Sequence, residues 1–326
     1  MRTSIGALLV MAACGGGGGG GGDDGPATGT SGPYFDHDMF FNRDVSGVAP
    51  AANSGAIISA LRQEGGWGNG DRMQIDFSFD VLSGEGAPMR TFTPTGDFYD
   101  PDCDQVPVPV PTAGNVEGES GYACTQDGDC HLIVFDGSAG KLYEMWRANI
   151  TSTFEGGCLA VWDTRMQYGD TLRGDQCTSA DAAGFPIAPL LFTADEVAAG
   201  KIDHAIRFIL PNNRVRRGYV RPATHGTDTT GIANAPAYGV HLRLRADYPI
   251  DSLPSEGAKV IARAMQKYGM YHADGGNIAL TAQSDRYTTA KWDGLLDAHD
   301  LSALRVEDFE VIDHGAMIDL TLDCTR

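Results

Sequence analysis

The chain has 326 residues, and 43 acidic against 24 basic residues give it a formal net charge of −19 at pH 7. This charge argues against a nucleic acid as partner, because proteins that bind phosphates concentrate Lys and Arg on one surface. No apolar stretch reaches the length of a helix that crosses a bilayer.

The first thirteen residues are predicted to be a signal peptide. Arg2 supplies a positive charge, residues 5–13 are mostly apolar, and Ala12 and Ala13 are the small residues that a signal peptidase needs. Cys14 follows at once, and this order resembles the lipobox of bacterial lipoproteins. The resemblance implies that Cys14 is lipidated and anchors the protein in a lipid bilayer, at the bacterial outer membrane or cell surface.

Residues 14–33 are predicted to be a flexible linker. Cys14 is followed by eight glycines, and the other residues are Asp, Ala, Thr, Ser, Pro and Gly. Such a segment cannot bury enough apolar surface to fold. An alternative, a disordered tail after an ordinary signal peptide, stays open.

Residues 34–326 are predicted to form a single, mostly β domain. Short alternating segments bounded by Gly, Pro, Asn and Asp are typical of antiparallel sheets, and they favour a jelly-roll-like β-sandwich with a few short helices. We expect 202–210 and 218–221 to form a hairpin that turns at 211–213. In chain order, the predicted strands are 73–81, 131–136, 142–147, 158–163, 202–210, 218–221 and 238–245.

Four helices are predicted from apolar faces and capping residues. The first two cover 54–62 and 194–199, and the second begins with Thr193 and Glu196 in a capping-box arrangement. The third covers 254–268, with Ser252 or Ser255 as its N-cap and Gly269 in a left-handed turn at its end. The fourth covers 291–298.

Six cysteines remain in the body if Cys14 carries lipid, and an even number in an exported protein predicts three disulfide bonds. Local pairs that flank a turn or a hairpin-sized segment are preferred. A zinc site is the competing use of thiols, but the chain has no Cys-x-x-Cys or His-x-x-x-His spacing. The preferred pairs are Cys124 with Cys130, Cys158 with Cys177, and Cys103 with Cys324.

Three short segments have a recognisable pattern. They are Thr-Ser-Ala-Asp-Ala-Ala-Gly at 178–184, Asp-His-Ala-Ile-Arg-Phe at 203–208, and Tyr-Val-Arg-Pro-Ala-Thr-His at 219–225. In this order they resemble a group of secreted bacterial β-rich proteins of unassigned activity, and the likeness extends over residues 36–313. The resemblance implies a secreted β-rich domain and transfers no catalytic residue, although some members accompany carbohydrate-processing modules.

A cationic set is the first candidate site, and three of its members alternate on the expected exposed face of 238–245. Guanidinium groups bind carboxylates and sulfates through paired hydrogen bonds, so the set predicts an acidic polysaccharide as ligand, with His225 as the base of a lyase. A simpler interpretation, that these arginines neutralise nearby Asp and Glu, stays open. The set is Arg207, Arg221, His225, His241, Arg243 and Arg245.

Glu144 and Trp146 form the second candidate site. Both fall on one face of 142–147, and Asp163 ends a nearby strand. Because glycosidases use two carboxyl groups, Glu144 and Asp163 are candidate catalytic residues and Trp146 a sugar-binding one. The alternative is a core tryptophan with an acid at a strand edge. His204 shares a strand face with apolar residues, so it is interpreted as a hydrogen-bonded core histidine.

An acidic segment is the third candidate site. Asp100, Asp102 and Asp104 have the spacing that begins an EF-hand loop, but the glycine and the glutamate of that loop are missing. Both a looser calcium site at these three residues and a solvated acidic loop fit the sequence. The neighbouring acids are Asp97, Asp127 and Asp129.

Two functions are consistent with these patterns. The first is a lipid-anchored carbohydrate-active enzyme, a polysaccharide lyase or glycoside hydrolase that acts on acidic glycans. The second is a non-catalytic glycan-binding or envelope-associated lipoprotein. Turnover of a polysaccharide distinguishes the first from the second.

The predicted anchor can be tested at Cys14. Cys14→Ser removes the thiol that the lipid modifies, so we expect the variant to leave the membrane fraction and to lack the lipid mass on its N-terminal peptide. Cell fractionation and mass spectrometry measure the two effects. If the variant stays in the membrane fraction as the parent does, the anchor assignment is wrong.

Overall fold

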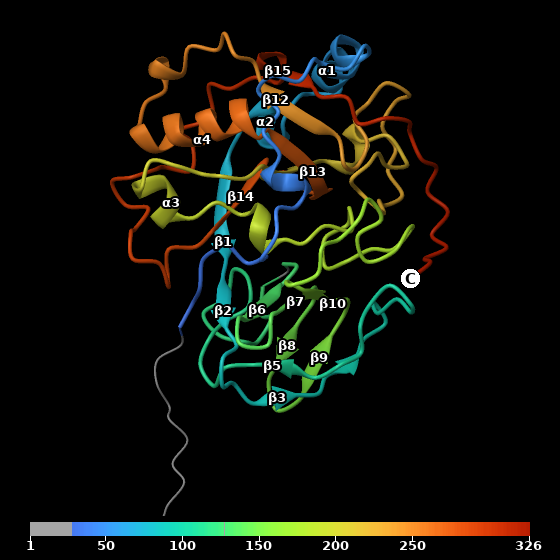
Figure 1. Ribbon diagram of the computed structural model, residues 1–326, viewed down its shortest axis with the longest axis vertical. Coiled ribbons are helices and arrows are strands. Elements are labelled where there is room, and N and C mark those ends of the chain that lie inside the picture. The colour runs from blue at the N-terminus through green and yellow to red at the C-terminus, as the bar shows by residue number, and fades with distance from the viewer. Residues whose placement is uncertain (1–27, 127) are drawn as a thin grey trace, which may run out of the picture.

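A computed structural model describes residues 28–126 and 128–326 (Figure 1). The predicted signal peptide, Cys14 and the run of glycines lie outside the described residues, and so does Asp127. Among the described residues, no helix is long and apolar enough to cross a membrane.

Strands dominate the described chain and helices are few, as predicted. The strands are β1 (Ile75–Phe79), β2 (Val81–Ser83), β3 (Met89–Arg90), β4 (Thr93–Pro94), β5 (Val108–Pro109), β6 (Leu132–Asp136), β7 (Lys141–Met145), β8 (Asn149–Ile150), β9 (Phe154–Gly156), β10 (Leu159–Asp163), β11 (Ile206–Leu210), β12 (His241–Leu244), β13 (Met270–Gly275), β14 (Leu280–Gln283) and β15 (Phe309–Val311). The α-helices are α1 (Ser54–Gln63), α2 (Gly68–Asp71), α3 (Ala194–Ala198) and α4 (Glu256–Lys267). Short 3-10 helices cover Phe40–Asn42, Ala188–Leu190, Asn212–Arg214, Ile250–Ser252 and Val306–Asp308.

The larger sheet has six strands in the order β1-β14-β11-β13-β12-β15. β1 runs parallel to β14 and β11 runs parallel to β13, whereas β12 is antiparallel to both of its neighbours. In the four-stranded sheet, β2 and β6 are also parallel. The prediction of purely antiparallel sheets was therefore wrong, because long connections rather than tight hairpins join these neighbouring strands.

The hairpin expected from 202–210 and 218–221 does not form. Only the end of the first segment becomes a strand, β11, and its neighbours are β13 and β14. Tyr219 makes isolated bridges with Tyr238 and Ile318 instead. The chain leaves the sheet directly after β11 at Pro211, which has no N–H group to continue a ladder.

Three of the four predicted helices form, as α1, α3 and α4. Thr193 and Glu196 make the expected capping box before α3. Ser255 is the N-cap of α4, since its Oγ accepts a hydrogen bond from Ala258 N at 3.1 Å. Gly269, with a φ of 73°, follows α4 in the left-handed conformation. The buried side chains of α4 belong to the main hydrophobic core and include Val260, Ile261, Ala264 and Met265.

The helix expected over 291–298 is absent, and this segment consists of turns and bends. Gly294 has a φ of 73°, a left-handed conformation that interrupts a right-handed helix. The sequence pattern was wrong here because an apolar spacing that fits a helix also fits a loop packed on the core. Trp292, for example, is buried and donates its Nε1 hydrogen to Gln283 O at 3.1 Å.

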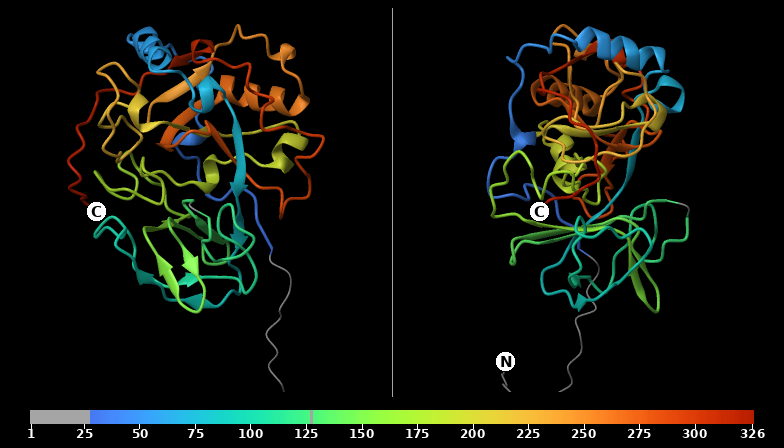
Figure 2. Two further views of the ribbon diagram at one scale, coloured as in Figure 1. Left: turned by 180° about the vertical axis from the view of Figure 1, so that it is seen from behind. Right: turned by 90° about the vertical axis from the view of Figure 1, so that its right-hand side faces the viewer.

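The smaller sheet has the order β10-β7-β6-β2, and the chain passes between the two sheets from β1 to β2 and again from β10 to β11. Only Asp80 separates β1, at the edge of the larger sheet, from β2, at the edge of the smaller one (Figures 1 and 2). The predicted strand over 73–81 thus becomes two strands that serve two sheets. Phe79 and Val81, at this junction, pack in one apolar cluster with Trp162 and Leu191.

The last residues of the predicted linker are part of the fold. Thr30 N donates to Val81 O at 3.0 Å, and Ser83 N donates to Thr28 O at 2.8 Å. Gly29 bridges to Leu82 between these two bonds. The described chain is therefore ordered against β2 from residue 28, earlier than the predicted boundary at 33.

Three disulfide bonds join the six body cysteines, as predicted. Of the three preferred pairs, only Cys124 with Cys130 was assigned correctly. Asp104 N donates to Leu159 O at 2.7 Å, and Asp175 bridges to Thr325. These contacts bring together segments that are far apart in sequence, which cysteine spacing cannot reveal. The bonds are Cys103–Cys158, Cys124–Cys130 and Cys177–Cys324.

The disulfide bonds should contribute unequally to stability. Cys177 and Cys324 are 147 residues apart, whereas Cys124 and Cys130 are 6 apart. Loop-closure entropy in the unfolded chain gives ~5 kcal/mol for the long loop and ~2 kcal/mol for the short one. We expect the double Ser variant of the long bond to lower the free energy of unfolding by more than that of the short bond. Urea denaturation measures both, and equal losses contradict the entropic account.

Candidate functional site

A pocket of about 450 Å³ lies at the carboxyl ends of the parallel strands β11 and β13. Its walls also include loops beside β6, β7 and β10 of the smaller sheet. This volume is in the range of pockets that hold small-molecule ligands. The lining residues that bear on its chemistry are Asp102, Asp129, Trp146, His225, Tyr238 and Asp274.

Behind the pocket, one guanidinium holds two carboxyl groups. Arg207 Nε and Nη2 each donate to Asp181 at 2.9 Å, and Nη2 also lies 3.2 Å from Asp274 Oδ2. Arg207 Nη1 donates to Thr281 Oγ1 at 3.0 Å. Arg207 is 2% exposed and Asp181 is fully buried, whereas the Asp274 side chain, 22% exposed, reaches the pocket. Asp274 is therefore the member of this group that a ligand can contact.

The surroundings of Asp274 favour the protonated form of its carboxyl group. Burial raises the pKa of Asp274 to about 8, and the negative charge of Asp181 adds to this effect. Arg207 and the Gly275 N–H oppose the increase, and Asp129 contributes to it. A carboxyl group in this state can donate a proton to a bound ligand and recover it from solvent.

Asp129 and Trp146 form another part of the wall. Trp146 Nε1 donates to Asp129 Oδ1 at 2.9 Å, and the Arg147 guanidinium lies 4.9 Å from the centre of the Trp146 ring. Asp129 is exposed and Trp146 is partly exposed. Such a pair suits a sugar, because an aromatic ring covers the apolar face of the sugar while a carboxylate accepts hydrogen bonds from its hydroxyl groups.

His225 and Tyr238 add neutral polar groups. A carbonyl oxygen only accepts hydrogen bonds, so His225 donates from Nδ1 to Ala182 O at 2.9 Å, and its Nε2 carries the lone pair. Burial lowers the pKa of His225, which keeps the ring uncharged at neutral pH. The Tyr238 hydroxyl lies 3.0 Å from Thr227 Oγ1, and burial raises the pKa of Tyr238 above its ordinary value.

The three segments singled out in the sequence meet beside this pocket. Asp181, in the first, pairs with Arg207, in the second. His225, in the third, donates to Ala182 O in the first, and the neighbouring Thr224 N donates to Ala183 O at 3.0 Å. The segments therefore form one unit around the pocket, although they are separate in sequence.

The expected exposed cationic face was wrong for His241 and Arg243, whereas Arg245 is exposed as predicted. His241 is 5% exposed and Arg243 is 7% exposed, because the segment around Val45, whose carbonyl oxygen accepts from Arg243, covers that side of β12. Burial lowers the pKa of His241 to about 4, so its ring is neutral. Of the predicted set, His225 lines the pocket described above. Each arginine of the set has a carboxylate partner, in the pairs Arg207–Asp181, Arg221–Asp175, Arg243–Glu310 and Arg245–Asp247.

Glu144, a predicted catalytic residue, is fully buried and lies outside the pocket lining. Its Oε1 accepts from Ile187 N and Ala188 N, each at 2.8 Å, and its Oε2 accepts from Trp162 Nε1 at 3.0 Å. Burial raises the pKa of Glu144 to about 7, although these three N–H donors favour its charged form. Because no substrate can reach this carboxyl group in the folded chain, its contacts support a structural role and not the predicted catalytic one.

Asp163 and His204 also lie outside the pocket lining. Asp163 pairs with Lys141 at 2.8 Å, and its side chain is 41% exposed, so it does not face Glu144 across a shared cavity. His204 Nδ1 lies 2.8 Å from Ala205 O, and Nε2 lies 3.2 Å from Glu196 Oε1. His204 is hydrogen-bonded as expected, but it precedes β11, is only partly buried and lines a second pocket, so it is not a core histidine.

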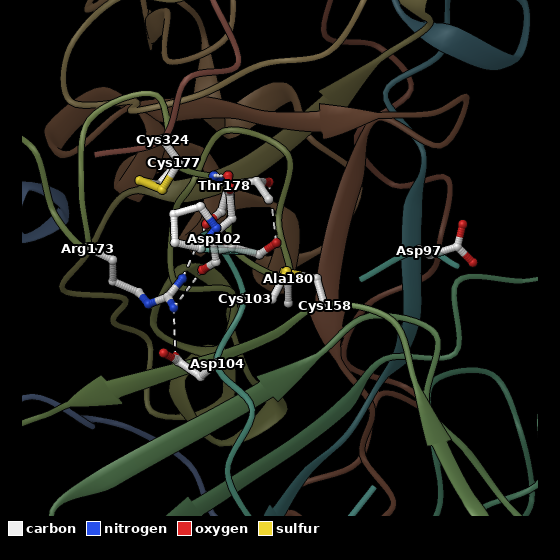
Figure 3. The surroundings of a disulfide bond; sticks show 12 residues. Asp97, Asp102, Cys103, Asp104, Cys158, Arg173, Cys177, Thr178, Ala180 and Cys324 are labelled. Atoms are coloured by element: carbon white, nitrogen blue, oxygen red, sulfur yellow. Dashed lines mark hydrogen bonds and ion pairs between the residues drawn. A yellow bond between two sulfur atoms is a disulfide. The ribbon is translucent and has the colours of Figure 1, made fainter. Parts of the chain in front are cut away.

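Two of the three residues expected to bind calcium, Asp102 and Asp104, are engaged by protein donors (Figure 3). Asp102 Oδ2 accepts from Thr178 N at 2.8 Å, and Asp104 Oδ2 accepts from Arg173 Nη2 at 2.7 Å. Asp100 is exposed. Calcium requires several oxygen atoms that converge on one point, and two of these side chains already direct oxygens at N–H groups. The arrangement therefore argues against a calcium site built from these three residues.

Comparisons of the chain with protein-family models, with curated proteins and with solved structures find no match. Function therefore has to be inferred from the chemistry of the pocket. Sequence reasoning did not single out Asp181 or Asp274, which determine that chemistry. The signal for Asp274 was its position at the polar end of an alternating segment, directly before Gly275 and Gly276.

A structural role for Glu144 can be tested with a matched control. Glu144→Ala leaves three buried N–H donors without an acceptor, so we expect the free energy of unfolding to fall by about 3 kcal/mol. Asp163→Ala removes an exposed ion pair and should change it by less than about 1 kcal/mol. Chemical denaturation measures both. A Glu144→Ala variant as stable as the parent contradicts this assignment.

Proposed function

We propose that the protein binds a carbohydrate in this pocket and hydrolyses a glycosidic bond there. The observation that carries the proposal is that two carboxyl groups line one pocket: Asp274, whose pKa burial raises, and Asp129, which accepts a hydrogen bond from Trp146. Glycosidases use two carboxyl groups, and the one that acts as acid has a raised pKa. Asp129 lies in the loop before β6 and Asp274 lies in β13, and the charge of Asp129 contributes to the raised pKa of Asp274.

In the proposed reaction, Asp274 gives its proton to the glycosidic oxygen as the bond to the anomeric carbon breaks. The electron pair of that bond stays on the leaving oxygen. A water molecule adds its hydroxyl group to the anomeric carbon and passes its proton to Asp129. Loss of this proton to solvent and uptake of another by Asp274 restore the enzyme. Trp146 covers the sugar ring, and His225 Nε2 accepts from a sugar hydroxyl group.

The charges that line the pocket favour a neutral or amino-bearing sugar. Four aspartates line it, and Arg207, which lies behind one of them, is already paired with Asp181. Even with Asp274 protonated, an acidic glycan would bring further negative charge next to the other three carboxyl groups. The acidic polysaccharide expected from the sequence, and a lyase reaction on it, are therefore the less favoured proposal. The four residues are Asp102, Asp129, Asp228 and Asp274.

Two further proposals come from the sequence patterns. Lipidation of Cys14 would hold the protein at the bacterial outer membrane or cell surface, where a glycan-processing activity meets its substrate. A sandwich-like packing of the two main sheets is supported by the apolar cluster that contains Phe79, Trp162 and Leu191.

A protein that binds glycans without cleaving them is the alternative function, supported by the partly exposed Trp146.

Variants of the pocket test the proposed hydrolysis. Asp274→Asn removes the proton donor and should lower kcat by about 100-fold or more, with KM little changed. Trp146→Ala should raise KM, and Asp163→Asn, outside the pocket, is the control that should change neither. In the parent, kcat should fall as the pH rises through about 8, because Asp274 then loses its proton. Release of reducing ends from neutral, amino-bearing and acidic polysaccharides is the measurement.

Other results of this screen identify the alternatives. Binding without release of reducing ends supports the non-catalytic function. Unsaturated products, detected by their absorbance, support a lyase. An Asp274→Asn variant as active as the parent contradicts the proposed role of Asp274.

A further inference from the structure

We propose that Asp181 is a positioning residue for Asp274: it holds the Arg207 guanidinium in a two-bonded pair and so leaves the Asp274 carboxyl group free to carry the proton that enters the pocket. This inference rests on the proposed hydrolysis for its purpose. Its central measurement needs no substrate, so the two can fail separately.

The contacts of Arg207 are unequal. Asp181 receives two hydrogen bonds of 2.9 Å from two different nitrogens, the fork geometry in which a guanidinium binds a carboxylate most strongly. Asp274 receives one longer contact of 3.2 Å from a nitrogen that already donates to Asp181. The charge of Arg207 is therefore directed mainly to Asp181 and only partly to Asp274.

The loop that carries Asp181 is fixed by its own hydrogen bonds. Asp181 N donates to Ser179 Oγ at 2.9 Å, and Ser179 Oγ donates to Phe185 O at 2.6 Å. Gly184 N donates to Asp181 O at 2.9 Å, with Gly184 at a φ of 78°. Asp181 therefore cannot move towards Asp274 or away from Arg207 without breaking this loop.

Charge balance then selects the site of the proton. One guanidinium cannot neutralise two buried carboxylates, so the group favours one bound proton. Asp181 is fully buried and accepts two hydrogen bonds from Arg207, whereas the partly exposed Asp274 accepts one longer contact, so the geometry places the proton on Asp274. None of the other titratable groups that line the pocket or adjoin Asp274 supplies a positive charge at neutral pH; they are Tyr99, Asp102, Asp129, His225, Asp228, Tyr238 and His272.

The test compares two isosteric variants, Asp181→Asn and Asp175→Asn. Asp181→Asn removes the competing carboxylate, so Arg207 turns its charge to Asp274, and the titration midpoint of Asp274 should fall by about one to three pH units. Asp175, which pairs with Arg221 outside the pocket lining, is the control, and Asp175→Asn should leave the midpoint unchanged. Carbon-13 NMR of protein labelled at its aspartate carboxyl groups measures the midpoint. The Asp274 signal is assigned by its loss in Asp274→Asn.

Activity provides the second measurement. The alkaline limb of the kcat profile on a cleaved glycan should move to lower pH in Asp181→Asn by the same interval as the NMR midpoint. An unmoved NMR midpoint in Asp181→Asn overturns the proposal, and a loss of thermal stability alone indicates a purely structural residue. A moved midpoint in a protein that cleaves no glycan supports the role of Asp181 and overturns the hydrolysis. If Asp181→Asn does not fold, the NMR titration of Asp274 in the parent protein is the test. An Asp274 midpoint of about 4, the value of an ordinary aspartate, overturns the proposal.

Discussion

The buried charge of Arg207 is the constraint on which the rest of the structure depends. A guanidinium that is 2% exposed is tolerated only with complete pairing, and its partners come from a loop and two strands. They are Asp181 in the loop before α3, Asp274 at the end of β13 and Thr281 in β14. The same guanidinium lies 5.4 Å from the centre of the Phe79 ring, where β1 meets β2. The order of the strands, the wall of the pocket and the junction of the two sheets thus all place groups around the buried guanidinium of Arg207.

The disulfide bonds lie beside the pocket, and one of them, Cys124–Cys130, also packs in a hydrophobic cluster. Each includes a cysteine that lines the pocket or adjoins a lining residue: Cys158 lines it, Cys130 follows Asp129, and Cys177 precedes Thr178. The rim of the pocket consists largely of loops, which lack the hydrogen-bonded ladders that fix strands in place. Covalent bonds supply there the restraint that the sheets supply elsewhere, so the pocket walls keep their separation without regular secondary structure.

Local features could be predicted from the sequence, and long-range ones could not. The N-cap of α4 at Ser255 and the capping box at Thr193 depend on residues a few positions apart, and both were found. The period-two pattern located β6, β7 and β10 but not their partners. In β12 it assigned polar residues to solvent, whereas Arg243 is buried because Glu310 and Val45 O satisfy it. The candidate site at Asp274 could not be predicted for the same reason. Asp274 is important because of its contact with Arg207 and the nearby charge of Asp181, which come together only when the chain folds.

The continuous segment that forms β1 and β2 belongs to two sheets, and the strands of these two sheets become available at different stages of synthesis. β2, β6, β7 and β10 all precede residue 164, so the smaller sheet has its strands once the first half of the chain is available. β1 precedes β2 directly, yet its partner β14 begins at Leu280. During synthesis, β1 therefore waits with an open edge, which is a template for wrong pairing, until nearly the whole chain has emerged.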